Sequence, residues 1–317
     1  MSDFSILQSF FLVLSSVILF IFGLQHFSKE VEGWGKARLN ALFQRWTRHR
    51  IMGFMLGGVA TALLQSSSAV SSIIISLVDS QILTFSQSLS VLIGTNVGTV
   101  ITAQLVAFKL TGIGPIFIVL GFFFGFHQKT KIAGKSIFYF GFILFALDLI
   151  GTSLGTFSSS FNLREYLLLG RSISSGIFYG AVFTMLVQSS SVTTGLIILL
   201  VQQEMIGLPM AVPMILGSNI GTTSTGLLVS LGMGKTARMT AVANFLFNVG
   251  GVVLVVPFIG FFISKLTASA LSPVLAVAQV HLWFNLINGI IFLLLLAPFE
   301  KLILKLFKLF KKSKLAL

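Results

Sequence analysis

The sequence predicts an all-α, polytopic transmembrane protein built from two inverted repeats, each with a re-entrant hairpin and a broken helix. The first observation is composition: of 317 residues, 55% are hydrophobic and only 9% are charged, with a mean hydropathy of +1.00. A water-soluble core cannot absorb so much apolar surface. Second, apolar stretches long enough to cross about 30 Å of hydrocarbon recur along the whole chain. Third, a polar motif occurs twice at a fixed separation.

The internal repeat is defined by two polar motifs that share one offset. Gln65-Ser66-Ser67-Ser68 recurs as Gln188-Ser189-Ser190-Ser191, an offset of 123 (188 − 65). The segment from Gly94 to Thr99 recurs as Gly217 to Thr222 with the same offset. Chance similarity between apolar sequences does not preserve two polar motifs at one separation. We therefore expect a first repeat over residues 1–127, a second over 128–258, an additional C-terminal transmembrane span within 259–300 and a basic cytoplasmic tail over 301–317.

The apolar pattern divides the chain into complete spans and two interrupted segments. Segments 52–79 and 175–202 each contain the polar motif, and from Gly53 to Leu64 there is only about 18 Å of helix, too little to cross the bilayer. We interpret both as re-entrant hairpins with the serines near their tips, with unwound spans as the alternative. Residues 28–50 combine tryptophans with basic residues, which is typical of an amphipathic interfacial helix. The complete spans are expected at 10–27, 85–108, 112–126, 137–155, 208–231, 239–258 and 273–298.

The basic residues predict the orientation of the chain in the membrane. If the hairpins make no net crossing and the N-terminus lies outside, segments 28–51, 127–136, 232–238 and the C-terminal tail are cytoplasmic. All but four of the 21 Lys and Arg residues then lie inside, as the positive-inside rule requires. The two hairpins enter from opposite faces, which makes the repeat inverted. Transporters with this symmetry bind their substrate near the midplane of the membrane.

The net charge of +13 does not indicate a nucleic-acid-binding protein, because the basic residues flank apolar spans instead of covering a solvated domain. The absence of cysteine excludes disulfides, thiolate metal sites and cysteine nucleophiles. A membrane enzyme is the weakest functional class, since no His/Asp/Ser constellation or metal cluster recurs in the apolar segments. We therefore expect no enzymatic activity and no metal beyond Na⁺.

Four patches rich in hydroxyl and amide groups lie inside otherwise apolar segments. Isolated Ser and Thr residues usually bond to their own helix or hold helices together, but four symmetric clusters are hard to explain in that way. A helix that begins after a serine-rich break presents unpaired N–H groups and the positive end of its dipole, which suits an oxyanion. Carbonyl oxygens from unwound backbone and from Asn and Gln suit Na⁺. Because these patches contain no Lys or Arg, a bound anion would need co-bound cations. The glycines of the second motif are expected to allow sharp helix breaks and close backbone approach, with simple helix packing as the alternative.

Through its doubled Q-S-S-S motif and the G-[ST]-N-[IV]-G-T motifs that follow, the sequence resembles the type II sodium/phosphate cotransporter family over roughly residues 10 to 300. The resemblance implies a bacterial Na⁺-driven phosphate transporter of the cell (inner) membrane, with inorganic phosphate, Na⁺ and the lipid bilayer as partners, a possible homodimer, no other cofactor and no nucleic acid. It assigns phosphate binding to Gln65, Ser66, Ser67, Ser68, Gln188, Ser189, Ser190 and Ser191. It assigns Na⁺ binding to Thr95, Asn96, Thr99, Ser218, Asn219, Thr222 and Thr223.

Two further candidates and three rival functions stay open. Asp148, the only acidic residue well inside a predicted span, serves either cation or proton coupling or the structural bonding of a nearby hydroxyl or amide. His281, Asn285 and Asn288 share a helical face by their spacing, so they either join helices or line the cavity. The rival functions are transport of sulfate or a small carboxylate, and phosphate sensing without transport. Competition among these anions during uptake distinguishes the substrates. A sensor would bind phosphate without producing flux.

Overall fold

The computed structural model describes residues 3–160 and 172–313, and every regular element in these two ranges is helical. Two short 3₁₀ segments, Leu110–Ile113 and Val256–Phe258, connect longer helices. The α-helices are α1 (Asp3–Trp46), α2 (Arg50–Leu64), α3 (Ser67–Asp79), α4 (Phe85–Gly98), α5 (Val100–Ala107), α6 (Gly114–Phe126), α7 (Lys131–Ser160), α9 (Ile173–Val187), α10 (Ser190–Gln202), α11 (Leu208–Ser230), α12 (Lys235–Val255), α13 (Ile259–Thr267), α14 (Pro273–Leu294) and α15 (Leu296–Ser313).

Five helical stretches of the described residues are long and apolar enough to cross a membrane, which makes the chain a multi-pass membrane protein. They correspond to five of the seven predicted spans. The predicted span 112–126 is the short helix α6, and the predicted span 208–231 is α11, whose polar centre keeps it out of this set. The five stretches are Leu7–Gly33, Phe85–Ala107, Lys131–Phe157, Lys235–Thr267 and Pro273–Leu294.

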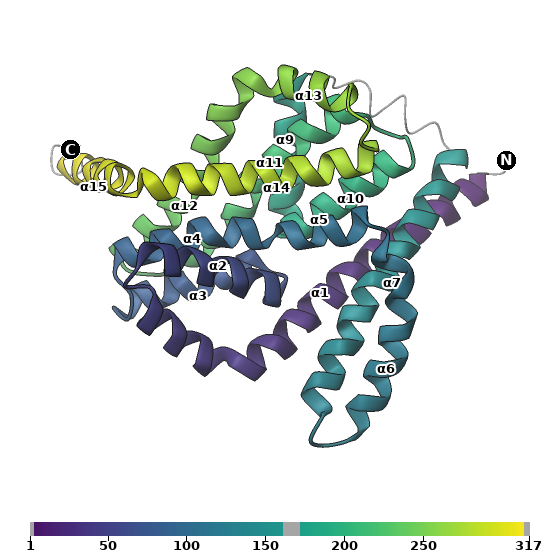
Figure 1. The fold of residues 1–317 in the computed structure, drawn as a ribbon, viewed down its shortest axis with the longest axis horizontal. Coiled ribbons are helices and arrows are strands. Elements are labelled where there is room, and N and C mark those ends of the chain that lie inside the picture. The colour runs from purple at the N-terminus through teal and green to yellow at the C-terminus, as the bar shows by residue number, and fades with distance from the viewer. Residues whose placement is uncertain (1–2, 161–171, 314–317) are drawn as a thin grey trace.

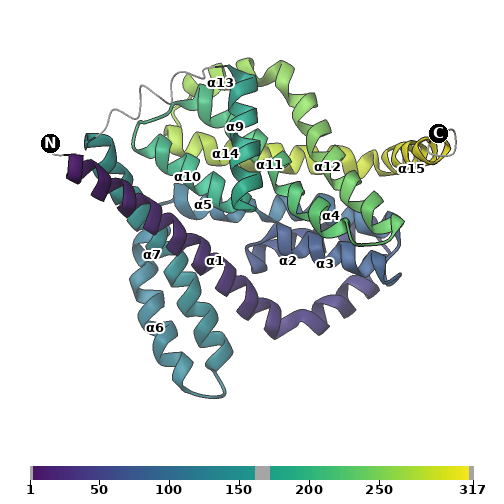
Figure 2. The same ribbon diagram turned by 180° about the vertical axis from the view of Figure 1, so that it is seen from behind.

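Helix α1 is longer than the first predicted span. It runs for 44 residues without interruption and includes most of segment 28–50, for which we expected a separate interfacial helix. Figures 1 and 2 show α1 as a curved helix that passes beside α7 and then bends around toward α2. Phe43, near its C-terminal end, is fully buried against α2 and α3. The second half of α1 therefore packs against the body of the protein.

The sequence repeat reappears in the bounds of the helices. The first residues of α2, α3 and α4 are 50, 67 and 85, and those of α9, α10 and α11 are 173, 190 and 208. Each pair differs by 123, the offset of the polar motifs (for example 173 − 50). Both halves thus contain a helix that ends at the motif, a helix that begins in the motif and a third helix that packs against the first. The same helix starts therefore recur in both halves.

Glycines allow the first and third helices of each half to pack with their backbones in contact. A Cβ atom on Gly94 of α4 would collide with the carbonyl oxygen of Phe54 in α2. A Cβ atom on Gly217 of α11 would collide with the carbonyl oxygen of Ile177 in α9. Small residues at such spacing are typical of tightly packed transmembrane helices. The expectation that these glycines break their helices is wrong for α11, which is continuous over 23 residues, and α4 and α5 are separated only by Thr99 in a helical conformation.

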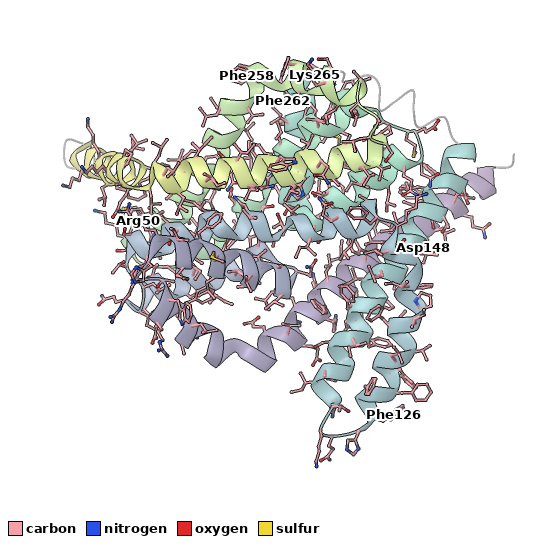
Figure 3. The ribbon with its side chains drawn as sticks, viewed as in Figure 1. Arg50, Phe126, Asp148, Phe258, Phe262 and Lys265 are labelled. Carbon is pink, nitrogen blue, oxygen red and sulfur yellow. The ribbon has the colours of Figure 1, made fainter. Side chains whose placement is uncertain are left out.

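Helices α6 and α7 form an antiparallel hairpin that extends away from the repeated helices, with Phe126 near its end (Figures 1 and 3). Close packing along this hairpin depends on glycine: a Cβ atom on Gly121 would collide with the backbone nitrogen of Phe138. Helix α1 lies against α7 over much of its length. These three helices therefore form one unit beside the repeated helices.

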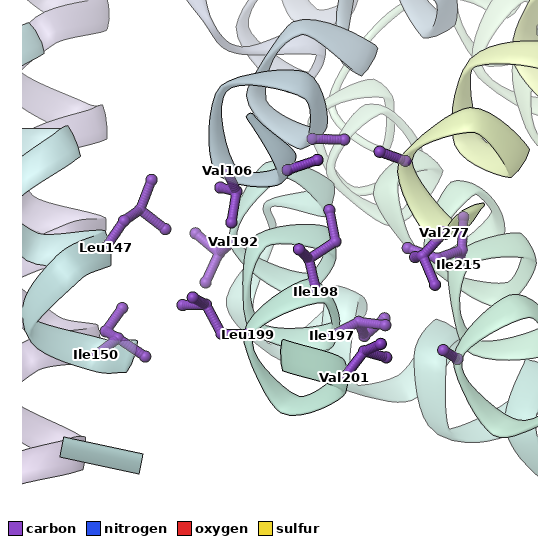
Figure 4. Packing of buried hydrophobic residues seen from close by; sticks show 14 of the residues in the cluster. Val106, Leu147, Ile150, Val192, Ile197, Ile198, Leu199, Val201, Ile215 and Val277 are labelled. Carbon is purple, nitrogen blue, oxygen red and sulfur yellow. The ribbon is translucent and has the colours of Figure 1, made fainter. Parts of the chain in front are cut away.

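Helix α10 lies at the centre of the largest apolar core. Figure 4 shows Val192 and Ile198 of α10 surrounded by residues of neighbouring helices, including Leu147 of α7, Val106 of α5 and Val277 of α14. All of these side chains are buried. Because α10 is enclosed by α5, α7, α11 and α14, the serine motif at its N-terminus is held on a rigid support.

The C-terminal region is helical where we expected a basic tail. Helix α15 begins at Leu296 and is described to Ser313. Its residues Leu296, Phe299 and Ile303 are buried against Phe85 and Leu89 of α4, in a cluster that also contains Met239 of α12. The apolar face of α15 is therefore part of the fold, whereas its lysines occupy the other positions of an amphipathic helix.

Candidate functional site

The two Q-S-S-S motifs lie on the wall of one cavity with a volume of about 520 Å³. Gln65, Ser66 and Ser68 contribute from the first half, and Gln188 and Ser189 contribute from the second. Segments separated by more than 100 residues in the sequence thus share one site. The cavity is also lined by α1 and by Thr225 of α11.

Each motif forms the same break between two helices. Gln65 has φ 52° and Gln188 has φ 57°, so each glutamine ends a helix in the left-handed conformation. The next residue begins the following helix: the hydroxyl of Ser66 accepts a hydrogen bond from the backbone N–H of Ala69 at 3.1 Å, and Ser189 accepts one from Val192 at 3.4 Å. Serine is a preferred N-cap residue because its oxygen satisfies one of the free N–H groups of the first turn. Both motifs therefore direct a helix N-terminus toward the cavity.

The two breaks are in direct contact. The hydroxyl of Ser68 in the first half donates a hydrogen bond to the backbone carbonyl oxygen of Gln188 in the second half, at 3.2 Å. The left-handed conformation of Gln188 leaves this carbonyl outside the hydrogen-bond ladder of α9. A relative movement of the two halves at the site must break or rearrange this bond.

The halves differ in how the glutamine side chain is held. Gln65 accepts a hydrogen bond from the hydroxyl of Thr102 at 2.8 Å and donates one to the carbonyl oxygen of Ala62 at 2.6 Å. The residue of the second half that corresponds to Thr102 is Thr225 (102 + 123). Its buried hydroxyl has no hydrogen-bond partner among the described residues, and Thr225 lines the cavity. The site therefore contains an unpaired polar oxygen.

Five of the eight predicted phosphate-binding residues line the cavity. The others, Ser67, Ser190 and Ser191, are buried within the first turns of α3 and α10 and do not contribute to the wall. Ser67 and Ser190 are the first helical residues, so their backbone N–H groups belong to the unpaired set at a helix N-terminus. A phosphate role for these three residues stays a prediction.

The seven predicted Na⁺-binding residues are buried but do not line this cavity. Most of their side chains bond to the carbonyl oxygens of their own helix, as Ser218 does to Ile215 at 2.8 Å and Thr222 does to Ser218 at 3.0 Å. An exception joins two helices, because Asn96 donates to the side-chain oxygen of Asn248 at 3.0 Å. Thr95, Thr99, Asn219 and Thr223 follow the first pattern.

The sequence interpretation missed the contribution of α1 to the cavity. Four polar residues of α1 line the cavity together with the two motifs: Gln25, Ser28, Lys29 and Glu32. Their spacing of three, four and seven residues places them on one face of a helix. That spacing is visible in the sequence, but it lies at the end of the first span, where basic residues are ordinarily explained by topology.

Thr225 was missed as well, although it belongs to the polar segment that follows Asn219. The sequence signal that could have identified it is its correspondence to Thr102 at the offset of the repeat.

Asp148 lies on α7 (Figure 3). It is not among the residues that line this cavity. It lines a smaller pocket of about 240 Å³ together with Lys109 and Thr111, and the Thr111 hydroxyl lies 3.5 Å from its carboxylate. His281, Asn285 and Asn288 are buried in α14 and do not line the main cavity either. Asn285 donates to the carbonyl oxygen of His281 at 2.8 Å. Among the described residues there is no group of three or more His, Cys, Asp or Glu that could hold a metal ion.

One protein family matches the chain in two consecutive segments, in keeping with its two repeats. A family described as "Na+/Pi-cotransporter" matches residues 19–152 and 161–293. The chain is 29% identical to the uncharacterized protein YqeW of Bacillus subtilis over 290 residues, 90% of this chain and 94% of YqeW. It is 25% identical over 293 residues to YjbB of Escherichia coli, named as a candidate exporter of inorganic phosphate. That match covers 91% of this chain but 54% of YjbB, so the chain spans about half the length of this relative.

A shorter match of 124 residues, 34% identical, links the chain to the sodium-dependent phosphate transport protein 2B of Bos taurus. It covers 38% of this chain and 18% of the bovine protein. No solved structure matches the chain.

Proposed function

The chain belongs to the Na⁺/Pi-cotransporter family, and from this premise we propose that it is a secondary active transporter that moves inorganic phosphate across the cell membrane together with Na⁺. Family membership supports phosphate as the substrate. The observation that carries the proposal is that both Q-S-S-S motifs, one from each half, line a single cavity of about 520 Å³. A site built in this way from two repeats suits a transporter that exposes one site to alternate sides of a membrane.

The chemistry of the cavity suits an oxyanion. Helices α3 and α10 both begin at its wall, and each presents free backbone N–H groups and the positive end of its dipole. The hydroxyls of Ser66, Ser68 and Ser189 add donors that can turn toward a bound anion. Hydrogen bonds to a charged phosphate oxygen are stronger than those between neutral groups. We assign phosphate to this cavity, between the two breaks.

Sodium is the proposed coupling ion, and the oxygen atoms around Gln188 are the most suitable ligands. The Thr225 hydroxyl has no partner among the described residues, the Gln188 side chain lines the same wall, and the Gln188 carbonyl lies outside the ladder of its helix. A hard cation prefers such neutral oxygens. A cation here would also offset the charge of a phosphate held mainly by neutral donors. In this conformation, we assign the seven residues that were predicted to bind Na⁺ to helix packing. Their role in Na⁺ binding stays a prediction.

In the proposed orientation the two helix pairs α2–α3 and α9–α10 are re-entrant hairpins from opposite faces, the N-terminus lies outside and the C-terminus is cytoplasmic. The distribution of basic residues supports this arrangement. Residues 28–32 then place the mouth of the cavity on the cytoplasmic side. Such a cavity can release imported phosphate or collect phosphate for export, and the name of YjbB favours export as the second candidate.

Uptake by proteoliposomes that contain the purified full-length chain tests the proposal. An inward Na⁺ gradient should drive accumulation of labelled phosphate, and a gradient of an inert cation should not. Equal uptake under both gradients would reject Na⁺ coupling. Phosphate binding without flux would instead indicate a phosphate sensor. Stronger inhibition of uptake by sulfate or a carboxylate than by unlabelled phosphate would indicate that the other anion is the substrate.

A further inference from the structure

The wall that α1 contributes to the cavity carries charge, unlike the two motifs. Gln25, Ser28, Lys29 and Glu32 all line the cavity, and their spacing defines one continuous polar face of α1. Ser28 is buried, whereas Gln25 and Lys29 are exposed, which places Lys29 toward the open side of the cavity. The face lies on α1, outside the helices α2 to α4 and α9 to α11, whose first residues recur at the offset of 123.

Among the described residues that line the cavity, Lys29 is the only basic one. It forms no salt bridge within the described residues. A nearby lysine, Lys135 of α7, is already engaged, because its ammonium group lies 2.9 Å from the carboxylate of Glu30. Glu30 and Lys29 are adjacent in sequence but point from α1 in different directions, since successive residues of a helix differ by about 100°. The positive charge of Lys29 is therefore free to act on the contents of the cavity.

We propose that Lys29 is the charge partner of phosphate at the mouth of the cavity and determines its selectivity for anions. This inference rests on the proposed function, because it assumes that phosphate occupies the cavity. The two breaks supply neutral donors and helix dipoles, which position an oxyanion but carry no full positive charge. Lys29 supplies that charge from the third wall. Its flexible side chain can follow the anion from the mouth toward Ser66 and Ser189.

The proposal predicts a dependence on charge that a purely structural lysine would not show. Lys29→Arg keeps the charge and should bind phosphate nearly as the wild type does. Lys29→Gln keeps much of the length and polarity of the side chain but removes the charge. Because hydrogen bonds to charged groups are stronger than those between neutral groups, and because Lys29 is exposed and partly screened by solvent, we expect Lys29→Gln to raise the KM for phosphate by roughly tenfold. Glu32→Gln removes a negative charge from the same wall and should lower the KM by a smaller factor.

Salt provides the second readout. At fixed Na⁺ concentration, a rise in ionic strength with an inert salt should raise the wild-type KM, because the exposed part of a charge pair is screened. The KM of Lys29→Gln should depend much less on salt, since the charge responsible is missing. Loss of protein structure cannot produce this change in slope. Thermal unfolding of each purified variant in detergent identifies any variant that fails to fold.

The experiment measures initial rates of phosphate transport in proteoliposomes for the wild type, the three variants and Lys135→Gln. Lys135→Gln is the matched control, because it removes an equal charge that lies outside the cavity and should leave the KM unchanged. If the wild type transports phosphate and Lys29→Gln has the same KM and the same dependence of KM on salt, the inference is overturned and the proposed function stays intact. The same KM increase in Lys135→Gln would also overturn it. Absence of phosphate transport in the wild type would instead reject the proposed function.

Discussion

The hydroxyl of Ser68 and the backbone carbonyl of Gln188 are joined by a 3.2 Å hydrogen bond that connects the two halves of the chain. These residues are 120 positions apart in the sequence, and each belongs to one copy of the same motif. The contact brings two helix N-termini to the same cavity.

Removal of the capping hydroxyls should weaken phosphate binding from both halves. Ser66→Ala and Ser189→Ala each remove a hydroxyl that lines the cavity and caps a helix. We expect the affinity for phosphate to fall by roughly tenfold in each variant, with a loss of about 1 kcal/mol of stability from the cap. Isothermal titration with phosphate in Na⁺ measures the affinity.

Ser272→Ala provides the matched control for capping. The Ser272 hydroxyl caps α14 by accepting from the N–H of Leu275 at 3.3 Å, but it does not line the cavity. This variant should lose a similar amount of stability and keep its phosphate affinity. Normal affinity in both cavity variants would exclude these hydroxyls from the site, and an effect in only one half would show that the site is asymmetric.

Corresponding threonines in the two halves should respond differently to removal of their hydroxyls. Thr102→Val breaks the bond to Gln65 and should destabilise the protein by about 1 kcal/mol. Thr225→Val removes a buried hydroxyl that has no partner among the described residues, so it should not lower stability. If that hydroxyl binds Na⁺, the Na⁺ concentration for half-maximal transport should rise by roughly fivefold. A normal Na⁺ dependence in Thr225→Val would remove this residue from the ion site.

Alanine at the packing glycines should separate the helices of each half. Gly94→Ala and Gly217→Ala place a methyl group against a backbone carbonyl of the neighbouring helix, so each should cost about 1–3 kcal/mol. Thermal unfolding in detergent provides the measurement. Gly260→Ala in α13 is the control, because a Cβ atom there meets no other atom within 4 Å, and it should be neutral or slightly stabilising. Unchanged stability in both packing variants would contradict the close backbone contact.

The proposed orientation places Lys129 on the cytoplasmic side of the membrane and Lys265 on the outer side. Because the chain has no cysteine, single cysteines can be introduced without background labelling. Lys129→Cys in the turn between α6 and α7 should react with an impermeant thiol reagent only from the cytoplasmic side, and Lys265→Cys in α13 only from outside. Both lysines are exposed. Reaction of both variants from one side would refute the inverted topology. Arg164, which is also expected outside, lies beyond the described residues.

Coupling between the ligands should be reciprocal. If one site holds phosphate and Na⁺ together, Na⁺ should raise the affinity for phosphate, and phosphate should raise the affinity for Na⁺ by the same factor. Titration of each ligand at several concentrations of the other measures both factors. Equal phosphate affinity in Na⁺ and in an inert cation would rule out a coupled site.

Local sequence signals predicted the helical class, the repeat and the breaks at Gln65 and Gln188. These features depend on apolar length, on serine capping and on interactions within a few residues, so they are readable from the chain itself. The helix bounds then recur at the same offset of 123 as the motifs (190 − 67). The continuation of α1 from the first span through Trp46 was not predicted, because it depends on the burial of Phe43 against α2 and α3.

The sequence by itself determined which residue types meet at the site, whereas the tertiary structure decided which of them reach the cavity. Glycines at 94 and 217 are compatible with either a helix break or close packing, and only the approach of α2 and α9 selects packing. A continuous helix keeps every backbone group bonded in the membrane, which favours the intact α11. Likewise, the charge of Lys29 becomes part of the site because α1 lines the same cavity as the two breaks, an arrangement of distant segments that no local pattern encodes.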